Sequence, residues 1–266
     1  MFAATMRNVF WLQQTEADVP AENDWLCGAE KLRLNRIRFP KRRADWRLGR
    51  WTGKCACAAY LGRSAQARFL SEIEIRPALS GAPEVFVGDR AEAAAISLSH
   101  RAGTAMVAIS APGIALGCDL EIAEPRSDAF IADYFTLEEQ LLLALAPAAD
   151  RLALVALLWS AKESALKALH EGLRLDTRSV VVNLGEHPQI SRDTAHNSSA
   201  PGLPTWSQAA SNRSQNGWQA FQVRCISCDH TLHGWWQCAG SLVRTVVADA
   251  PLLPPLSMNP FSRQTE

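Results

Sequence analysis

Two short segments, roughly forty residues apart, constrain this chain more than any other part of its sequence. Residues 117–121 read GCDLE, and residues 159–167 read WSAKESALK. Side chains alternate along a strand, so Asp119 and Glu121 would share one face if the first segment is a strand. In a helix, Trp159, Glu163 and Lys167 form one stripe at spacing i, i+4, i+8. The two segments therefore predict a strand and a helix that gather three carboxylates at one site, with Lys167 and Lys162 within reach.

This set of side chains indicates a metal site that handles phosphate. Three oxygen ligands suit Mg²⁺, which is held by few carboxylates and keeps its other positions for water and substrate phosphate. Asp119, Glu121 and Glu163 are the predicted ligands. Each segment alone is also typical of a solvated strand edge or helix face, but their combination favours a site.

The same two segments resemble the signature segments of the 4'-phosphopantetheinyl transferases of the surfactin-synthetase-activating type. Ser97 to His100 resembles the Ser-His element of this family, Phe39 to Arg50 its basic N-terminal segment, and Gly81 to Pro83 its Gly-x-Pro turn. The motifs stand in the family's order and cover roughly residues 31–185. The resemblance implies an α/β (α+β) fold with two similar lobes in a pseudo-twofold arrangement and the site between them.

The resemblance also implies an activity, a holo-carrier-protein synthase. Coenzyme A would donate its phosphopantetheine arm to a serine of an acyl or peptidyl carrier protein, and 3',5'-ADP would be released. Glu163 would take the serine proton and Lys167 would assist the leaving phosphate, beside Mg²⁺ on Asp119, Glu121 and Glu163. The donor would be held by phosphate-contacting residues, which we expect to be Arg47, Ser99 and His100, with Lys41, Arg42, Arg43 and Lys162 as further candidates.

The chain departs from the family pattern at two positions. Ser97 stands where many members have Asn, and Ala82 stands where a phosphate-contacting Lys or Arg is common. One contact to coenzyme A is therefore expected to be missing. The length of 266 residues resembles the longer, monomeric members rather than the short trimeric holo-acyl-carrier-protein synthases.

Two other kinds of function use the same features. A protein that docks carrier proteins without catalysis would not need the four residues Asp119, Glu121, Glu163 and Lys167. A Mg²⁺-dependent nucleotide phosphohydrolase would use the same carboxylates on water, and would act without a protein acceptor. The fatty-acid, polyketide or nonribosomal-peptide origin of the carrier is left open.

The charge distribution excludes a general attraction to nucleic acid or anionic membranes, because Lys plus Arg equals Asp plus Glu at 27 each. The basic side chains concentrate locally. Residues 31–54 hold ten of them against the single acid Asp45. A helix over residues 44–61 would place Arg47, Arg50 and Lys54 on one face, where they could line an anion-facing wall.

Cysteine usage and the absence of long apolar runs predict a soluble cytoplasmic protein with no export signal. The seven cysteines are odd in number and lack the spacing of a disulfide scaffold. The most apolar run, residues 141–159, is interrupted by Pro147, Asp150 and Arg151. One cluster of zinc-ligand types is left open between a metal site and ordinary strand positions; it comprises Cys225, Cys228, His230, His233 and Cys238.

The order of elements predicts an N-terminal lobe over residues 1–112 and a C-terminal lobe over 113–250. The second lobe would hold the metal site and a mobile insert at 186–216, and residues 251–266 would form a disordered tail. Strands are expected at 84–87, 105–110, 117–122, 179–184, 218–225 and within 232–247. Thr136 and Glu139 form the pattern of a capping box that opens one helix, and a second helix spans 152–170.

Overall fold

The computed structural model describes residues 7–92, 94–184 and 217–259. Its strands and helices follow one another along the chain as β1 (Val9–Thr15), α1 (Gly28–Arg36), α2 (Pro40–Tyr60), α3 (Ala67–Leu70), β2 (Ile73–Pro77), β3 (Pro83–Val87), β4 (Arg90–Ala91), β5 (Ala95–Arg101), β6 (Thr104–Ser110), β7 (Leu116–Ile122), α4 (Asp128–Tyr134), α5 (Leu137–Leu145), α6 (Ala148–Ala168), β8 (Val180–Asn183), β9 (Gln219–Cys225), β10 (His230–Ala239), β11 (Leu242–Ala248) and β12 (Leu256–Ser257). Short 3₁₀ turns occupy Glu16–Asp18, Gly172–Arg174 and Thr177–Ser179.

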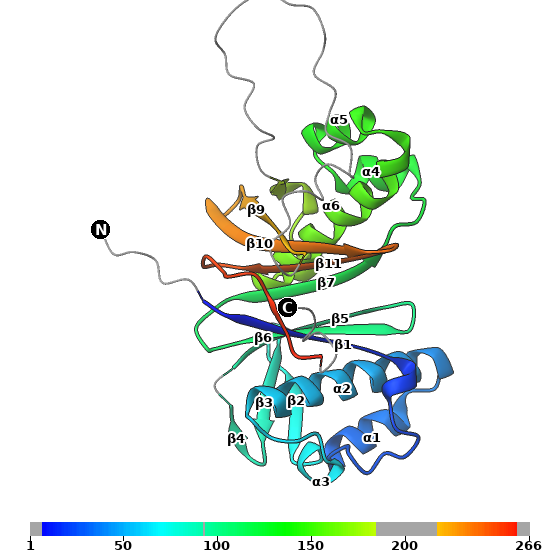
Figure 1. Ribbon diagram of the computed structural model, residues 1–266, viewed down its shortest axis with the longest axis vertical. Coiled ribbons are helices and arrows are strands. Elements are labelled where there is room, and N and C mark those ends of the chain that lie inside the picture. The colour runs from blue at the N-terminus through cyan, green and yellow to red at the C-terminus, as the bar shows by residue number, and fades with distance from the viewer. Residues whose placement is uncertain (1–6, 93, 185–216, 260–266) are drawn as a thin grey trace, which may run out of the picture.

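The fold is mixed α/β (α+β), as predicted, and its elements stack in layers (Figure 1). A first sheet of order β12-β1-β6-β5 faces a second sheet of order β7-β11-β10-β9-β8. Helices α4, α5 and α6 cover the outer side of the second sheet, and α2 covers the outer side of the first (Figure 1). The small sheet β2-β3-β4 and helices α1 and α3 pack around α2.

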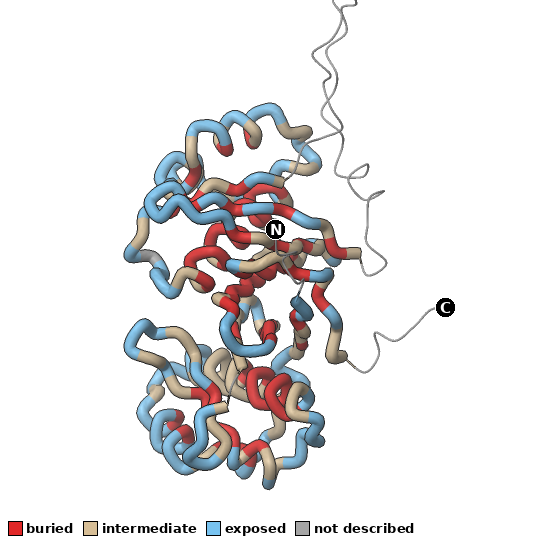
Figure 2. The backbone as a smooth tube through the Cα atoms, turned by 90° about the vertical axis from the view of Figure 1, so that its left-hand side faces the viewer, coloured by how far each residue is buried: buried red, intermediate tan, exposed pale blue. Residues whose placement is uncertain are grey.

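Buried apolar side chains fill the space between each pair of layers. Figure 2 shows that the buried residues are concentrated inside each half of the molecule. Leu157 and Val243 belong to the core between α6 and the second sheet. Ala56 and Val107 belong to the core under α2. Between the two sheets, apolar side chains such as Val246 are fully buried. Since a fully buried aliphatic side chain contributes about 1.5–3 kcal/mol, these cores hold the layers together.

The two long helices begin where local sequence signals allow it. Helix α2 starts at Pro40, whose fixed φ and missing N–H suit the first helical position, so it begins one turn before the predicted Ala44. The capping box predicted at Thr136 is present. The Thr136 hydroxyl accepts from the Glu139 N–H at 3.2 Å, and the Glu139 carboxylate accepts from the Thr136 N–H at 2.9 Å.

The basic face of α2 differs from the prediction of an anion-facing wall. Lys54 is fully buried, where its ammonium contacts the carboxylate of Glu30 and donates to the carbonyl oxygens of Trp25 and Leu70 at 3.0 Å each. Arg50 also turns toward Glu30, at 4.0 Å. This face packs against α1 and the segment before it, because the apolar residues of α2 share it with the charges. Lys54 and Arg50 therefore form ion pairs inside the lobe with Glu30.

The C-terminal segment also corrects the sequence prediction, because residues 251–259 are ordered. Leu252 is 3% exposed, and its carbonyl oxygen accepts from the Trp235 indole N–H at 3.1 Å. Strand β12 pairs in parallel with β1 at the edge of the first sheet. Proline-rich composition obscured the apolar residues that fill this edge. Residues 260–266 and the predicted insert at 186–216 lie outside the described residues.

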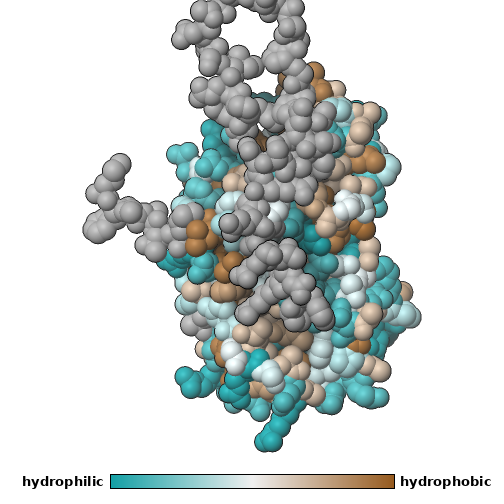
Figure 3. All heavy atoms as spheres, in the orientation of Figure 1, coloured by the Kyte–Doolittle hydropathy of each residue, from teal (hydrophilic) through white to brown (hydrophobic). Residues whose placement is uncertain are grey.

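The surface is unevenly hydrophobic. Leu137, Leu141 and Leu145 are each at least 60% exposed and recur every four residues on α5. Figure 3 shows hydrophobic side chains at this end of the molecule, whereas hydrophilic side chains dominate the opposite end around α1 and α3. Within the described ranges, no helix combines the length and the hydropathy that crossing a membrane requires.

Candidate functional site

Strand β7 presents Asp119 and Glu121 on the side that faces α6. Its neighbour β11 pairs Thr245 with Asp119, and the Thr245 hydroxyl lies 2.7 Å from the hydroxyl of Ser164 on α6. The Asp119 side chain is only 8% exposed. Its Oδ1 accepts from the Ser99 hydroxyl at 2.7 Å and from the Lys167 ammonium at 2.8 Å. The structure thus confirms the strand and brings Asp119, Ser99 and Lys167 together.

Helix α6 can approach β7 this closely because residue 117 is glycine. A Cβ at Gly117 would lie 1.8 Å from the carbonyl oxygen of Ser164, far inside van der Waals contact. The hydroxyls of Ser160, Ser164 and Thr245 form a buried hydrogen-bonded cluster that fixes the helix on the sheet. Lys167 is placed by the same contact, since its ammonium also donates to the Cys118 carbonyl oxygen at 2.9 Å.

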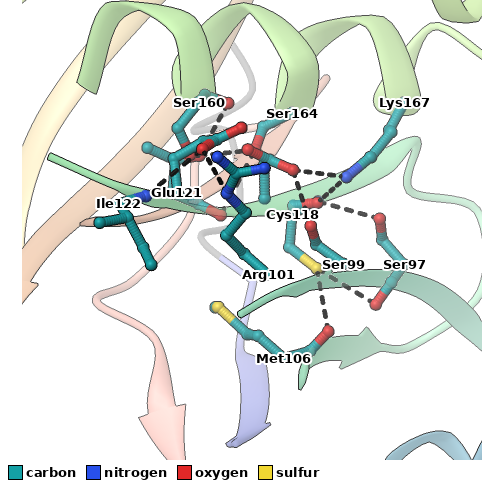
Figure 4. Close-up of polar contacts among 12 residues, drawn as sticks. Ser97, Ser99, Arg101, Met106, Cys118, Glu121, Ile122, Ser160, Ser164 and Lys167 are labelled. Atoms are coloured by element: carbon teal, nitrogen blue, oxygen red, sulfur yellow. Dashed lines mark hydrogen bonds and ion pairs between the residues drawn. The ribbon is translucent and has the colours of Figure 1, made fainter. Parts of the chain in front are cut away.

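Glu121 lies two residues along the strand, where two arginines hold it. The Arg101 Nε is 3.4 Å and the Arg126 Nη2 is 3.2 Å from its Oε2. Figure 4 shows Arg101 pointing toward Glu121 beneath α6. Both arginines also contact Glu124, Arg126 at 3.4 Å and Arg101 more closely. The Glu121 side chain is 12% exposed, so these contacts form at a partly desolvated position.

Burial and mutual repulsion shift the ionisation of this group. Burial, then the charge of Asp119, raises the pKa of Glu121 and the pKa of Glu163 above the ordinary value of a glutamate. Burial lowers the pKa of Lys167, but the Asp119 carboxylate and its neighbours outweigh it and hold that pKa above its usual value. The negative charge of Asp119 therefore acts on both glutamates, and Lys167 stays protonated beside the three carboxylates.

Strand β5 runs beside β7 at the junction of the two sheets, where it supplies donors and acceptors to the site. The Ser97 hydroxyl accepts from the Cys118 N–H at 2.9 Å, and Ser99 donates to Asp119. Ser97, Ser99 and Arg101 alternate along one face of β5, and all three point toward β7 (Figure 4). His100 lies between them on the other face and is exposed. The hydroxyl of Ser97 thus links the two strands.

The remaining predicted donor-binding residues lie on α2 and inside α6. Arg47 donates to the carbonyl oxygens of Pro20 and Ala21, the latter at 3.0 Å. Lys41 is exposed and pairs with Asp45 at 3.0 Å, and Arg42 is exposed near the start of the helix. The structure brings Asp119 together with Ser99 and Lys167, whereas Arg47 and Lys41 of α2 pair with other residues.

Lys162 has a structural position that does not favour the predicted phosphate contact. Its ammonium is fully buried, lies 2.9 Å from the Glu139 carboxylate, and donates to the carbonyl oxygens of Thr177 and Val180. These partners use all three of its N–H groups. A sequence cannot distinguish this lysine from Lys167, because both fall in one helix beside Glu163.

A pocket of about 400 Å³ lies at the start of β5 and β7, the two strands that carry site residues further along. Ile96 and Leu116 line it, and each precedes a site residue on β5 or β7. Ala82 and Pro83 of the Gly-x-Pro turn contribute another wall, and His170 closes the side nearest the end of α6. Its lining combines apolar side chains such as Ile96 and Leu116 with the polar Glu84, Glu92 and His170, so it suits a ligand that has both apolar and polar parts.

The side chains fit a divalent cation in kind, although they are not arranged as a finished metal centre. Asp119 Oδ2 is buried and has no hydrogen-bond partner in the described part of the chain, and two neighbouring carboxylates have raised pKa values. A hard cation would relieve both conditions. Yet no three His, Cys, Asp or Glu side chains among residues 7–92, 94–184 and 217–259 are grouped as a metal site. That holds for the Cys225 and Cys228 cluster as well.

Arg101, Arg126 and Glu124 are site residues that the sequence predictions missed. Arg101 could have been found, since it lies two residues beyond Ser99 and therefore shares its face on β5. Arg126 lies in the loop after β7, and no periodic pattern points to it.

Comparison with known proteins gives a family match that spans part of the candidate site. Residues 115–219 match the sequence model of the 4'-phosphopantetheinyl transferase superfamily, and the matched range contains both the 117–121 and the 159–167 segments. A comparison with curated proteins finds no match. The superfamily match supports phosphopantetheinyl transfer as the general class of activity, in a family that uses coenzyme A as its substrate.

Proposed function

We propose that this protein transfers the 4'-phosphopantetheine arm of coenzyme A to a serine of an acyl or peptidyl carrier protein and releases 3',5'-ADP. The observation that carries the proposal is the contact of Lys167 with Asp119 beside Glu163 and Glu121, inside the range that matches the superfamily. Further parts of the proposal are a monomer of the surfactin-synthetase-activating type and a place in the cytoplasm.

Glu163 is the proposed general base. The acceptor serine would attack the phosphorus that carries the pantetheine arm, the bond to 3',5'-ADP would break, and Glu163 would take the serine proton. Burial raises the pKa of Glu163, which makes its carboxylate a stronger base than an exposed glutamate. Lys167 is held protonated, so it can stabilise the charge that develops on the leaving phosphate.

Asp119, Glu121 and Glu163 are the proposed ligands of Mg²⁺. When bound, the ion would neutralise phosphate charge and orient the diphosphate. The Ser99 hydroxyl and the Lys167 ammonium already fix Asp119, so this ligand would keep its position without a large change in its rotamer.

The pocket at the start of β5 and β7 is the proposed position of the nucleotide end of coenzyme A. Ile96 and Leu116 in its lining suit a base, and Ser99 and His100 lie further along the same strand, β5. Arg47, Lys41 and Arg42 remain proposed phosphate contacts, although each would have to leave a present partner or reach inward from the surface. Lys162 is the least favoured of the proposed phosphate contacts, because its ammonium is buried and already paired.

The proposal is tested by measuring 3',5'-ADP release from coenzyme A and Mg²⁺ in the presence of several purified apo-carrier proteins. The matched control is each carrier with its acceptor serine replaced by alanine. Release that requires the serine supports the transferase. Release without any carrier indicates a hydrolase, and binding of coenzyme A and carrier without release indicates a docking protein.

A further inference from the structure

Two arginines form ion pairs with Glu121, which is one of the proposed metal ligands. Arg101 comes from β5 and Arg126 from the loop after β7, and both contact Oε2 of Glu121. Their side chains are 36% and 25% exposed, so both are partly open to solvent. Arg126 also lies 5.2 Å from the ring of Phe130, which restricts its position. Nothing in the proposed chemistry has so far used these cations.

Two of the proposed metal ligands, Glu121 and Asp119, are already paired with cations. With Glu121 held toward Arg101 and Arg126, and Asp119 held by Lys167, the described residues contain no three-ligand group. A divalent cation that took Glu121 would lie near two guanidinium groups, and like charges repel in a partly desolvated site. Both arginines also contact Oε1 of Glu124, but this single carboxylate would neutralise only part of their combined positive charge.

We propose that Arg101 and Arg126 exchange partners, releasing Glu121 to the cation and taking the diphosphate of the donor. This inference rests on the proposed function. A guanidinium presents a planar set of donors that matches phosphate oxygens, and both arginines are partly open to solvent, at 36% and 25% exposure. Arg101 is the last residue of β5 and shares its face of the strand with Ser99, which donates to Asp119.

Donor phosphate is favoured over an acidic surface of the carrier by position. The arginines contact the same carboxylate that flanks Asp119, and Lys167 contacts Asp119 from the other side. A diphosphate bridging this space would meet positive charge at both ends. An acidic side chain of a docked protein would reach only the exposed faces of the arginines.

The test measures Mn²⁺ affinity of the free protein by electron paramagnetic resonance, at fixed pH, for wild type, Arg101→Met and Arg126→Met. The exchange predicts that each variant binds Mn²⁺ more tightly, about fivefold or more, because a competitor for Glu121 is gone. Arg178→Met is the matched control, since Arg178 is 55% exposed and pairs with Asp176 away from the site. It should leave Mn²⁺ affinity unchanged. Mn²⁺ affinity that is unchanged or weaker in both site variants would overturn the inference.

Coenzyme A binding provides the second readout. Direct titration with coenzyme A and Mn²⁺ should show affinity about tenfold weaker in Arg101→Met and Arg126→Met than in wild type. Unchanged coenzyme A affinity with a raised KM for the carrier would contradict the inference and assign the arginines to carrier docking. Because neither titration requires turnover, a protein without transferase activity would refute the proposed function and still allow the exchange to be judged.

Discussion

Asp119 shows how one side chain can be built for a ligand at a cost to the folded protein. One of its oxygens receives two donors, from Ser99 and Lys167, while the other is buried without a partner in the described residues. An unsatisfied buried acceptor costs about 1–3 kcal/mol. Such a cost is common where function requires it, because a substrate or cation supplies the missing partner.

The Glu163→Gln substitution should remove activity and stabilise the metal-free protein. Loss of a positioned base is expected to reduce transfer by about 10²- to 10⁴-fold. Because the pKa of Glu163 is raised on folding, its ionisation destabilises the folded protein as the pH rises through that pKa. Glutamine removes this effect, so the free energy of unfolding at about pH 7.5 should increase by roughly 1 kcal/mol. Tm should increase with it.

The pH dependence distinguishes this cause from a general packing effect. Below the ordinary glutamate pKa of 4.5, Glu163 is protonated in both states, and the stabilisation by Gln should vanish. Thermal melts of the two proteins across this pH range measure the difference. A gain in Tm of equal size at low and neutral pH would show that the charge of Glu163 is not responsible.

Lys162 and Glu139 test whether the second lysine of the WSAKESALK segment is structural. Lys162→Met alone should cost about 3–5 kcal/mol, since it leaves a buried carboxylate without its cation. The double variant Lys162→Met/Glu139→Gln should recover much of that stability, as measured by urea unfolding. Its KM for coenzyme A should equal that of wild type. A KM raised tenfold in the folded double variant would restore the phosphate contact predicted from sequence.

The sequence was sufficient for some site residues and insufficient for others, for physical reasons. Asp119 and Glu121 follow from alternation along a strand, and Glu163 and Lys167 follow from helical spacing. Whether a lysine points into solvent, a site or the core depends on which helix face packs, so Lys162 was assigned to phosphate although it is enclosed. The Arg126 contact depends on the path of a loop.

Among the elements, helix α6 and strand β7 make the contact on which the site depends. Gly117 has no Cβ, and a Cβ at this position would clash with the backbone of α6. The strand and the helix can therefore approach each other closely. Ser160, Ser164 and Thr245 then bond across the gap. Close approach therefore sets the distance between the strand carboxylates and Lys167.

Gly117→Ala should be strongly destabilising, by about 3 kcal/mol or more, because the new methyl group would meet backbone rather than a movable side chain. Gly49→Ala is the matched control on the other long helix. A Cβ at Gly49 has nothing within 4 Å, so alanine should stabilise α2 by about 0.5–1 kcal/mol. Chemical denaturation of both variants tests the pair. Equal stability of the Gly117→Ala variant and wild type would contradict the close-approach explanation.

The two long helices share a local arrangement that the sequence did not reveal. Lys54 of α2 pairs with Glu30 near the start of α1, and Lys162 of α6 pairs with Glu139 near the start of α5. In both cases a short helix precedes a helix of 21 residues. The pseudo-twofold relation of the lobes stays a prediction, but this arrangement is what such a relation would produce.

The protein as a whole is joined by its two facing sheets and by the return of the chain to the first one. Cys118 on β7 bonds to Ser97 on β5, and the C-terminal segment passes from β11 to β12 beside β1. Sequence patterns predicted β3, β6, β7, β8 and β9, but they did not predict β1, β2, β4 or β5, and residues 232–247 form two strands, β10 and β11. The packing of residues 251–259 against the first sheet could not be predicted. Strand β12 has only two residues, which is too short for an alternating pattern to be seen in the sequence.

Leu252 and Leu253 test whether this return stabilises the protein. Leu252 is 3% exposed, so Leu252→Ala should cost about 2–4 kcal/mol. Leu253 is 37% exposed, and Leu253→Ala should change stability by less than about 0.5 kcal/mol. Both free energies come from denaturant unfolding. If the two variants lose the same stability, the C-terminal segment does not pack as described.

The most direct test of the central claim is the intact mass of an apo-carrier protein after incubation with this protein, coenzyme A and Mg²⁺. We predict a gain of one phosphopantetheine on the carrier, which disappears with chelator and with Glu163→Gln. A carrier of unchanged mass across fatty-acid, polyketide and nonribosomal-peptide carriers, while coenzyme A still binds, would contradict the assignment as a transferase.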